Sequence, residues 1–445
     1  MATFFALIGV IAGSLGQLWR NLVLKQTPKR VVARSTVSRS PLAGPKLTMP
    51  SPLWPWIAAL LALVLLAFIL ISTRSGPKPQ LPSFAVSPPP ANQFHSADES
   101  WSYLTGLPWR PNTAVWSTPA IGADGTVYAL GDNSLLAFEP GGKLKWSYAR
   151  RFAGDPQVAL LIADDGAIWT GTRFGWLIRI TPEGVAQEQF GGMGSTNQLA
   201  LSSEGYVLLS GDLMSGYILT SGYPKEQRDI SDAIRGNPGP MKSAAFTQAA
   251  VISIDKNRLS SSSLDFQRRN WMAGELPTCH HPAIARDGTI YLSCSNGVAA
   301  LSPDGSEIWK IPVQGPTPAV IAENGNVVFG ALDGNVYCLA PDGRLKWTFD
   351  TTSPIASVPA ISRSGTIYVG GRAGGLYAID PSGNVLWTVR MKGEVFSPAI
   401  ASDGTVYVQS SDGVLHAIAR PENGGLAGQW PKLDADERNT DRSPF

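Results

Sequence analysis

Histidine and cysteine are the residues of this chain best suited to catalysis or metal binding, and both are scarce. The 445 residues include four histidines and three cysteines. His280 and His281 are adjacent, and neighbouring residues of a strand point to opposite faces, so we do not expect both to ligate one metal. No pair of cysteines has zinc-ligand spacing. The sequence therefore predicts no metal, no cofactor and no catalytic residues.

Cys279 and Cys294 flank a turn at Asp287–Gly288 and are expected to lie opposite each other on two paired strands. In an oxidising compartment such a pair forms a disulfide, and in a reducing one it stays as two thiols. Both states are compatible with the sequence. Cys338 stands where related segments have alanine, which predicts a small buried side chain.

Aspartate followed by glycine recurs along the chain and has two interpretations, calcium loops or hairpin turns. No such segment supplies enough oxygen ligands for calcium. Tight hairpin turns need a positive φ, which glycine adopts easily, so we favour turns.

Glycines at turns of this kind recur about every 40 residues. This spacing indicates a supersecondary unit that repeats along the chain. They are Gly125, Gly166, Gly205, Gly288, Gly325, Gly365 and Gly404. The wide interval between Gly205 and Gly288 holds one further degenerate unit. Triplets such as Thr-Val-Tyr favour strands. We therefore predict an all-β fold, an eight-bladed β-propeller of four-stranded blades over residues 98–430.

The last unit lacks its outer strand, whereas Ser100-Trp-Ser-Tyr103 at the front repeats the pattern Lys145-Trp-Ser-Tyr148. We predict that the N-terminal strand completes the last blade and removes an open sheet edge.

The unit Ala-x-Asp-Pro-x-Gly-x-x-x-Trp, as in Ala378 to Trp387, resembles the repeat of pyrroloquinoline-quinone-type eight-bladed propellers. Within that family the chain is similar to a non-catalytic branch, the propeller lipoprotein of the bacterial outer-membrane protein assembly machinery. The resemblance implies that the outer-strand tryptophans dock against the neighbouring blade, and an indole suits such a place. These residues are Trp101, Trp146, Trp309, Trp347 and Trp387.

Residues 53–72 carry no charge and are long enough to cross a bilayer as one helix. Residues 1–97 hold nine Lys or Arg and no acidic residue, and seven of the nine precede this span. The positive-inside rule then places residues 1–52 in the cytoplasm and the propeller in the periplasm of a bacterial cell. The formal net charge of the whole chain is +2 and does not show this division. It gives no reason to expect nucleic-acid binding.

Three further segments complete the predicted organisation. Residues 2–19 are apolar and are interpreted as a second span or an interfacial helix. Translation that begins at Met49, or an organellar transit peptide, would equally account for this part of the chain. Residues 73–97 are a proline-rich, extended linker. Residues 431–445 form a C-terminal tail.

The stretch 221–242 breaks the repeat between the third and fourth blades. Isoleucines four residues apart suggest one or two helical turns. Loops on a rigid scaffold often carry function, so this stretch is either a partner-binding element or a tolerated insertion. Its candidate contact residues are Tyr223, Arg228, Ile230, Ile234 and Arg235.

Three functions fit this sequence to different degrees. A membrane-anchored, non-catalytic propeller that binds envelope proteins fits best. An envelope ligand binder or sensor would use aromatic residues outside the repeat pattern, namely Trp169, Trp176 and Trp271. A quinoprotein dehydrogenase fits least, because blades of about 40 residues leave little room for the long loops of a cofactor pocket.

Overall fold

The computed structural model describes residues 99–105, 118–131, 134–149, 157–172, 177–190, 196–202, 206–211, 217–220, 228–229, 241–255, 258–264, 268–420, 424–426, 432 and 436. The predicted membrane span at 53–72, the linker and the apolar segment 2–19 lie outside these residues. Among the described residues, no helix has the length and apolar character needed to cross a membrane.

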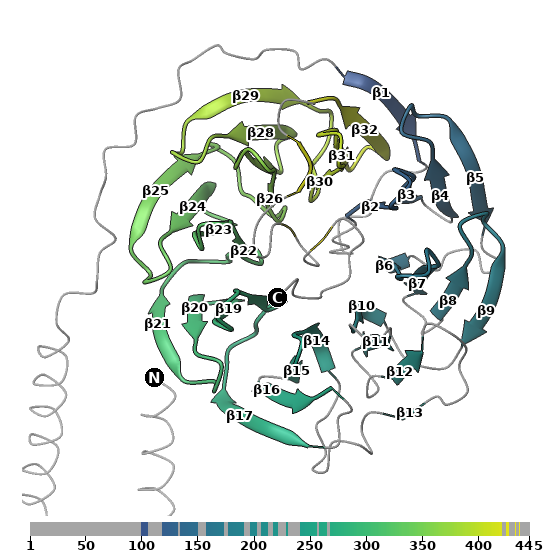
Figure 1. Cartoon of the computed structure of the whole chain (residues 1–445). Helices are drawn as coiled ribbons and strands as arrows, with labels where there is room; N and C mark the ends of the chain where they lie inside the picture. The colour runs from purple at the N-terminus through teal and green to yellow at the C-terminus, as the bar shows by residue number, and fades with distance from the viewer. Residues whose placement is uncertain are drawn as a thin grey trace, which may run out of the picture. The chain divides into compact units, whose positions relative to one another are not determined.

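The described strands form eight four-stranded antiparallel sheets, which we call blades 1 to 8 (Figure 1). In seven of these sheets the strands are hydrogen-bonded in chain order from the innermost strand outward, and in the eighth the outermost strand is β1. The predicted all-β propeller of four-stranded blades is therefore confirmed.

Blades 1 to 4 have these strands: β2 (Ala120–Ile121), β3 (Val127–Leu130), β4 (Ser134–Phe138) and β5 (Leu144–Ala149) in blade 1; β6 (Gln157–Ile162), β7 (Ile168–Thr172), β8 (Leu177–Ile180) and β9 (Ala186–Phe190) in blade 2; β10 (Thr196–Leu201), β11 (Tyr206–Gly211), β12 (Tyr217–Thr220) and β13 (Arg228–Asp229) in blade 3; β14 (Met241–Phe246), β15 (Ala250–Asp255), β16 (Arg258–Ser263) and β17 (Arg269–Glu275) in blade 4.

Blades 5 to 8 have these strands: β18 (Ala283–Ile284), β19 (Ile290–Cys294), β20 (Gly297–Leu301) and β21 (Glu307–Ile311) in blade 5; β22 (Val320–Ile321), β23 (Val327–Gly330), β24 (Asn335–Leu339) and β25 (Leu345–Asp350) in blade 6; β26 (Ala360–Ile361), β27 (Ile367–Gly370), β28 (Gly375–Ile379) and β29 (Val385–Arg390) in blade 7; β30 (Ala399–Ile400), β31 (Val406–Gln409), β32 (Val414–Ile418) and β1 (Glu99–Leu104) in blade 8.

The propeller closes through β1, as the sequence predicted. This strand comes first in the described chain but pairs with β32, with Tyr103 opposite Leu415. The Gln409 side chain then donates a hydrogen bond of 2.9 Å to the Leu130 carbonyl oxygen, which links blade 8 to blade 1. Because one blade takes strands from both ends of the repeat array, unfolding of either end opens the ring.

The hydrophobic core lies between neighbouring blades. In blade 5 every residue of β19 and β20 is buried, whereas β21 alternates between exposed and half-buried positions. Both faces of an inner strand are covered by the adjacent sheets, so such strands are apolar without alternation. One cluster of buried side chains joins blades 8 and 1, and similar clusters join blades 6 and 7 and blades 7 and 8.

Four Asp-Gly pairs form the turns between the first two strands of their blades, namely Asp124–Gly125, Asp165–Gly166, Asp287–Gly288 and Asp403–Gly404. Asp124 accepts a hydrogen bond of 2.9 Å from the Thr126 backbone N–H, and Asp287 and Asp403 make the same contact two residues on, also at 2.9 Å. An aspartate that accepts this bond stabilises the turn without any metal. The hairpin interpretation of these pairs is thus confirmed.

Candidate functional site

The contact that joins one blade to the next, which we call the blade joint, uses the outer-strand tryptophan. Its indole N–H donates to the carbonyl oxygen of a proline in the outer turn of the following blade. The pairs are Trp101–Pro140 at 2.9 Å, Trp146–Pro182 at 2.7 Å, Trp271–Pro303 at 2.7 Å, Trp309–Pro341 at 2.8 Å and Trp347–Pro381 at 3.0 Å. The proline turn also contains a glycine, and the indole packs on its backbone.

Trp387 makes a different contact from the other predicted docking tryptophans. In blade 8 the position that corresponds to Pro381 of blade 7, two residues after the end of the third strand, is Arg420. The guanidinium carbon of Arg420 lies 4.8 Å from the centroid of the Trp387 ring. A cation over an indole face is attracted by the ring quadrupole, and this pair takes the place of the proline hydrogen bond.

Two of the aromatic residues considered for ligand binding, Trp169 and Trp271, have packing roles in the described fold. Trp271 belongs to a blade joint. The sequence did not predict this role, because blade 4 has lost most of the repeat pattern. Trp169 is only 1% exposed and packs in the core between blades 2 and 3. Trp176 lies outside the described residues. The interpretation of Trp169 and Trp271 as exposed ligand contacts is therefore wrong.

The predicted partner loop at 221–242 is described only at Arg228 and Asp229 and at the start of β14. The first two residues form β13, the outer strand of blade 3, with Arg228 opposite Ile218. Part of the stretch is therefore a blade strand rather than an insertion. Tyr223, Ile230, Ile234 and Arg235 lie outside the described residues, so their role as partner contacts stays a prediction.

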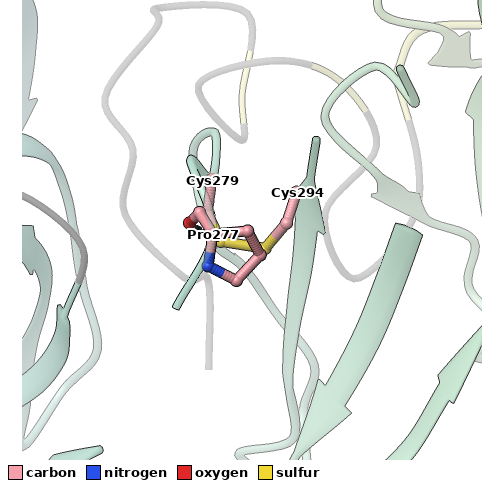
Figure 2. Close-up of a disulfide and its surroundings, with 3 residues drawn as sticks. All are labelled: Pro277, Cys279 and Cys294. Carbon is pink, nitrogen blue, oxygen red and sulfur yellow. Dashed lines mark hydrogen bonds between the residues drawn. A yellow bond between two sulfur atoms is a disulfide. The ribbon is translucent and has the colours of Figure 1, made fainter. Parts of the chain in front are cut away.

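Cys279 and Cys294 are joined by a disulfide at the start of blade 5 (Figure 2). Cys294 ends β19, and Cys279 is paired with it in an isolated antiparallel bridge. Figure 2 also shows Pro277 beside the disulfide, and its carbonyl oxygen lies 3.1 Å from the Cys279 Sγ. The equivalent bridge in blade 6 joins Pro316 to Ala331, without a covalent bond. The disulfide therefore ties the segment that enters blade 5 to its second strand.

The two adjacent histidines precede β18 rather than opening it. Burial lowers the pKa of both, and the pKa of His281 falls to about 3, with a smaller contribution from His280. The half-buried His281 is therefore neutral at neutral pH. In the described part of the chain, no group of three or more His, Cys, Asp or Glu side chains is arranged to hold a metal.

The lowered pKa of His281 should make the stability of the propeller pH-dependent. The unfolded chain binds a proton at His281 below about pH 6.5, whereas the folded chain does so only near pH 3. The free energy of unfolding is thus fully retained above pH 6.5 and falls as the pH is lowered toward 3. At pH 5 we expect this residue to account for a loss of roughly 2 kcal/mol.

Replacing His281 by valine, the residue at the equivalent place in blade 7 (Val358), should remove this dependence. Urea titrations at pH 7 and pH 5 measure it, and the His416→Gln variant serves as a control because it removes a half-buried histidine from a different blade. Equal losses of stability at pH 5 in the His281→Val variant and the parent chain would contradict the assignment.

The exposed apolar side chains on outer strands form a candidate contact surface. Met272 of β17 is 43% exposed and Ile308 of β21 is 55% exposed, and these strands belong to neighbouring blades (Figure 1). We call these two residues the blade 4–5 rim. At the register position of Ile308, blades 1 and 6 have Lys145 and Lys346. Blade 5 therefore places an exposed apolar side chain where blades 1 and 6 place a lysine, and blade 7 does the same with Leu386.

The comparisons with known proteins agree with this architecture. A family model described as outer membrane protein assembly factor BamB matches residues 294–364 and 332–437. The crystal structure of BamB from Moraxella catarrhalis is 18% identical, with a TM-score of 0.55, and the match covers 73% of this chain and 97% of that one. The computationally designed Ika8 protein is 16% identical, with a TM-score of 0.58, over 73% of this chain and 98% of its own. No curated protein sequence matches the chain.

Solved structures at such identities show the fold alone, and the family match adds the type of repeat. The chain resembles BamB in its propeller fold, and its repeat matches the BamB family model over residues 294–437. The family match covers blades 6 and 7, the last two strands of blade 5 and the first three strands of blade 8.

Proposed function

We propose that this protein is a membrane-anchored, non-catalytic propeller that binds other proteins in the bacterial cell envelope and acts as an assembly scaffold. The observation that carries the proposal is the match of residues 294–437 to the model of an outer membrane protein assembly factor. The predicted span at 53–72 and the linker at 73–97 supply the anchor and the spacer. The charge division between residues 1–97 and the rest of the chain supports a periplasmic propeller.

The disulfide supports the same compartment. Structural disulfides persist in oxidising compartments such as the periplasm and are rare in the cytosol. Cys279 and Cys294 are both buried, and their bond joins two segments of one blade.

The blade 4–5 rim is the surface that we propose for partner contact. Interfaces gain from apolar side chains that a partner covers, and they are poor in lysine at their centre. Met272 and Ile308 meet this condition, whereas the lysines at the Ile308 position in blades 1 and 6 do not. The proposal therefore assigns partner binding to the sector of the ring where exposed apolar side chains lie on the outer strands of two neighbouring blades.

Photo-cross-linking in living cells tests this function. The full-length chain carries a photo-reactive amino acid in place of Met272, and the captured proteins are identified by mass spectrometry. We expect one recurrent envelope protein, and we expect the additional change Ile308→Lys to reduce its capture at least about tenfold, since a charge then lies in an apolar contact. Surface changes of this kind alter stability by about 0.5 kcal/mol or less.

The matched control is Leu386→Lys, the same type of change at the same register position of blade 7, where the side chain is also exposed. Capture from Met272 should be unaffected by it. Failure to capture any envelope protein, or equal loss with both lysine variants, would contradict the proposed surface.

A further inference from the structure

Blade 6 differs from four of its sister blades at one position of the second strand. Blades 1, 5, 7 and 8 have a tyrosine there, and each ring packs against the outer-strand tryptophan of the same blade. The ring centroids are 5.8 Å apart for Tyr128–Trp146, 5.8 Å for Tyr291–Trp309, 5.6 Å for Tyr368–Trp387 and 5.8 Å for Tyr407–Trp101. In blade 6 the same position is Val328, so no ring of this blade lies beside Trp347 in that place.

The residue opposite this position also differs. Each of the four tyrosines has an alanine as its partner on the third strand, whereas Val328 is paired with Cys338. Cys338 is buried, and burial raises the pKa of its thiol to about 12, so the thiol stays protonated and unreactive. The side chain of cysteine replaces only part of the volume that a phenol ring would fill.

A pocket of about 290 Å³ lies where the ring is missing, between blades 6 and 7. Its floor is apolar and consists of Val328, Cys338, Ile361 and Ile367, all of them buried. Exposed residues from the turns of both blades, among them Asn324 and Arg363, surround the opening. Pro381, whose carbonyl oxygen accepts the Trp347 indole hydrogen bond, forms part of the wall.

The four sister blades show what chemistry this space accepts. Their tyrosine rings lie in the apolar clusters that join their own blade to the next one. Burial raises the pKa of Tyr128, Tyr291 and Tyr407 to about 12, so that their hydroxyls remain protonated. The Tyr407 hydroxyl lies 3.5 Å from the Pro140 carbonyl oxygen, the same oxygen that accepts the Trp101 N–H. For blade 6 the corresponding oxygen is the carbonyl oxygen of Pro381 in blade 7, which accepts the Trp347 N–H.

We propose that the pocket between blades 6 and 7 binds the tyrosine side chain of an extended segment of a partner protein, which supplies the ring that blade 6 lacks. This inference rests on the proposed scaffold function, because that function provides the partner. Burial of one ring supports only millimolar-range affinity, which would not retain a free phenol. A tyrosine on a protein already held elsewhere on the propeller binds as an effectively intramolecular group and needs no greater affinity.

Methyl NMR of the full-length chain with labelled isoleucine δ1 methyls tests the pocket directly. The probes are acetyl-Gly-Tyr-Gly-amide, acetyl-Gly-Leu-Gly-amide and p-cresol, each titrated to several millimolar. The tyrosine peptide should shift the methyls of Ile361 and Ile367, which lie on the pocket floor, through the ring current of the phenol, and the leucine peptide should not. No shift of these methyls with the tyrosine peptide would overturn the proposal.

The double change Val328→Tyr and Cys338→Ala copies the four sister blades and should fill the pocket with the protein's own ring. We expect it to keep the isoleucine spectrum of the folded chain and to weaken binding of the tyrosine peptide at least about tenfold. Leu332→Ala, an exposed position in the turn after β23, is the control and should leave binding unchanged. If the double variant proves unfolded, the contrast between the two peptides on the unmodified chain still decides the question.

Other sources of the ring give different results. If p-cresol binds ten times more tightly than the tyrosine peptide, the natural ligand of the pocket is a free phenol and not a partner segment. A shift of the Ile361 and Ile367 methyls on removal of residues 437–445 would mean that the chain's own C-terminus, which ends in Phe445, occupies the pocket. Either result overturns the assignment to a partner.

The cross-linking experiment separates this inference from the scaffold function. If the double variant loses the tyrosine peptide but still captures the same envelope protein from Met272 in undiminished yield, the pocket takes no part in docking while the scaffold function stands. If Met272 captures no protein, the scaffold function fails, and the methyl titration still reports on the pocket.

Discussion

Replacing Gly142 by alanine is expected to lower the free energy of unfolding by about 3 kcal/mol. Gly142 has a φ of +88°, a conformation that costs alanine energy, and a Cβ there would lie 2.6 Å from Cδ2 of Trp101. Trp101 is on β1, the strand that closes the ring, and it also packs against Phe138 and Tyr407. The change therefore strains the turn and displaces the indole at the closing joint.

The neighbouring residue provides the control for this prediction. Gly141 lies in the same turn, its φ is not in the left-handed region, and a Cβ added there would meet no atom within 4 Å. Gly141→Ala should leave stability unchanged or raise it by up to about 1 kcal/mol, because alanine restricts the unfolded chain. Chemical denaturation followed by tryptophan fluorescence measures both variants, and equal effects of the two alanines would refute the role of the blade joint.

Removal of the Cys279–Cys294 disulfide is expected to lower the free energy of unfolding by about 3 kcal/mol, the value for a closed loop of about 15 residues. The two cysteines are 15 residues apart, and both side chains are buried. The bond limits the freedom of the unfolded chain around β18 and β19. We therefore expect the Cys279→Ala, Cys294→Ala double variant to unfold at a lower urea concentration than the parent under oxidising conditions.

Dithiothreitol supplies an internal check on this prediction. With the reductant the parent chain should unfold close to the midpoint of the double variant, whose own midpoint should not change. Cys338→Ala, which places the sister-blade residue at the third cysteine, should respond to the reductant as the parent does. A parent chain whose midpoint is insensitive to dithiothreitol would show that the disulfide does not contribute.

Much of the fold could be predicted because its determinants are local. A turn such as Asp124–Gly125 is stabilised by its own aspartate, and the strands on either side consist of β-branched and aromatic residues. The pattern Trp-Ser-Tyr at the front of the array was enough to predict that β1 pairs with β32. Where the local pattern fades, in blade 4, sequence reasoning missed the docking role of Trp271.

The candidate sites were less predictable because they depend on neighbours that come from another blade. Val328 can be recognised in the sequence as the residue that replaces tyrosine in the repeat, but a pocket results only because blade 7 supplies the opposite wall. The depressed pKa of His281 likewise follows from burial, which no spacing of residues shows.

The sequence alone therefore determined the repeat, the four-stranded blades and the closing strand, since these follow from turn chemistry and strand alternation within about 40 residues. The tertiary structure decided which side chains are covered, such as Trp169 in a core, and which remain exposed, such as Ile308 on a rim. The physical reason is that burial is a property of packing between sheets, and each sheet of this ring receives its cover from the two sheets beside it.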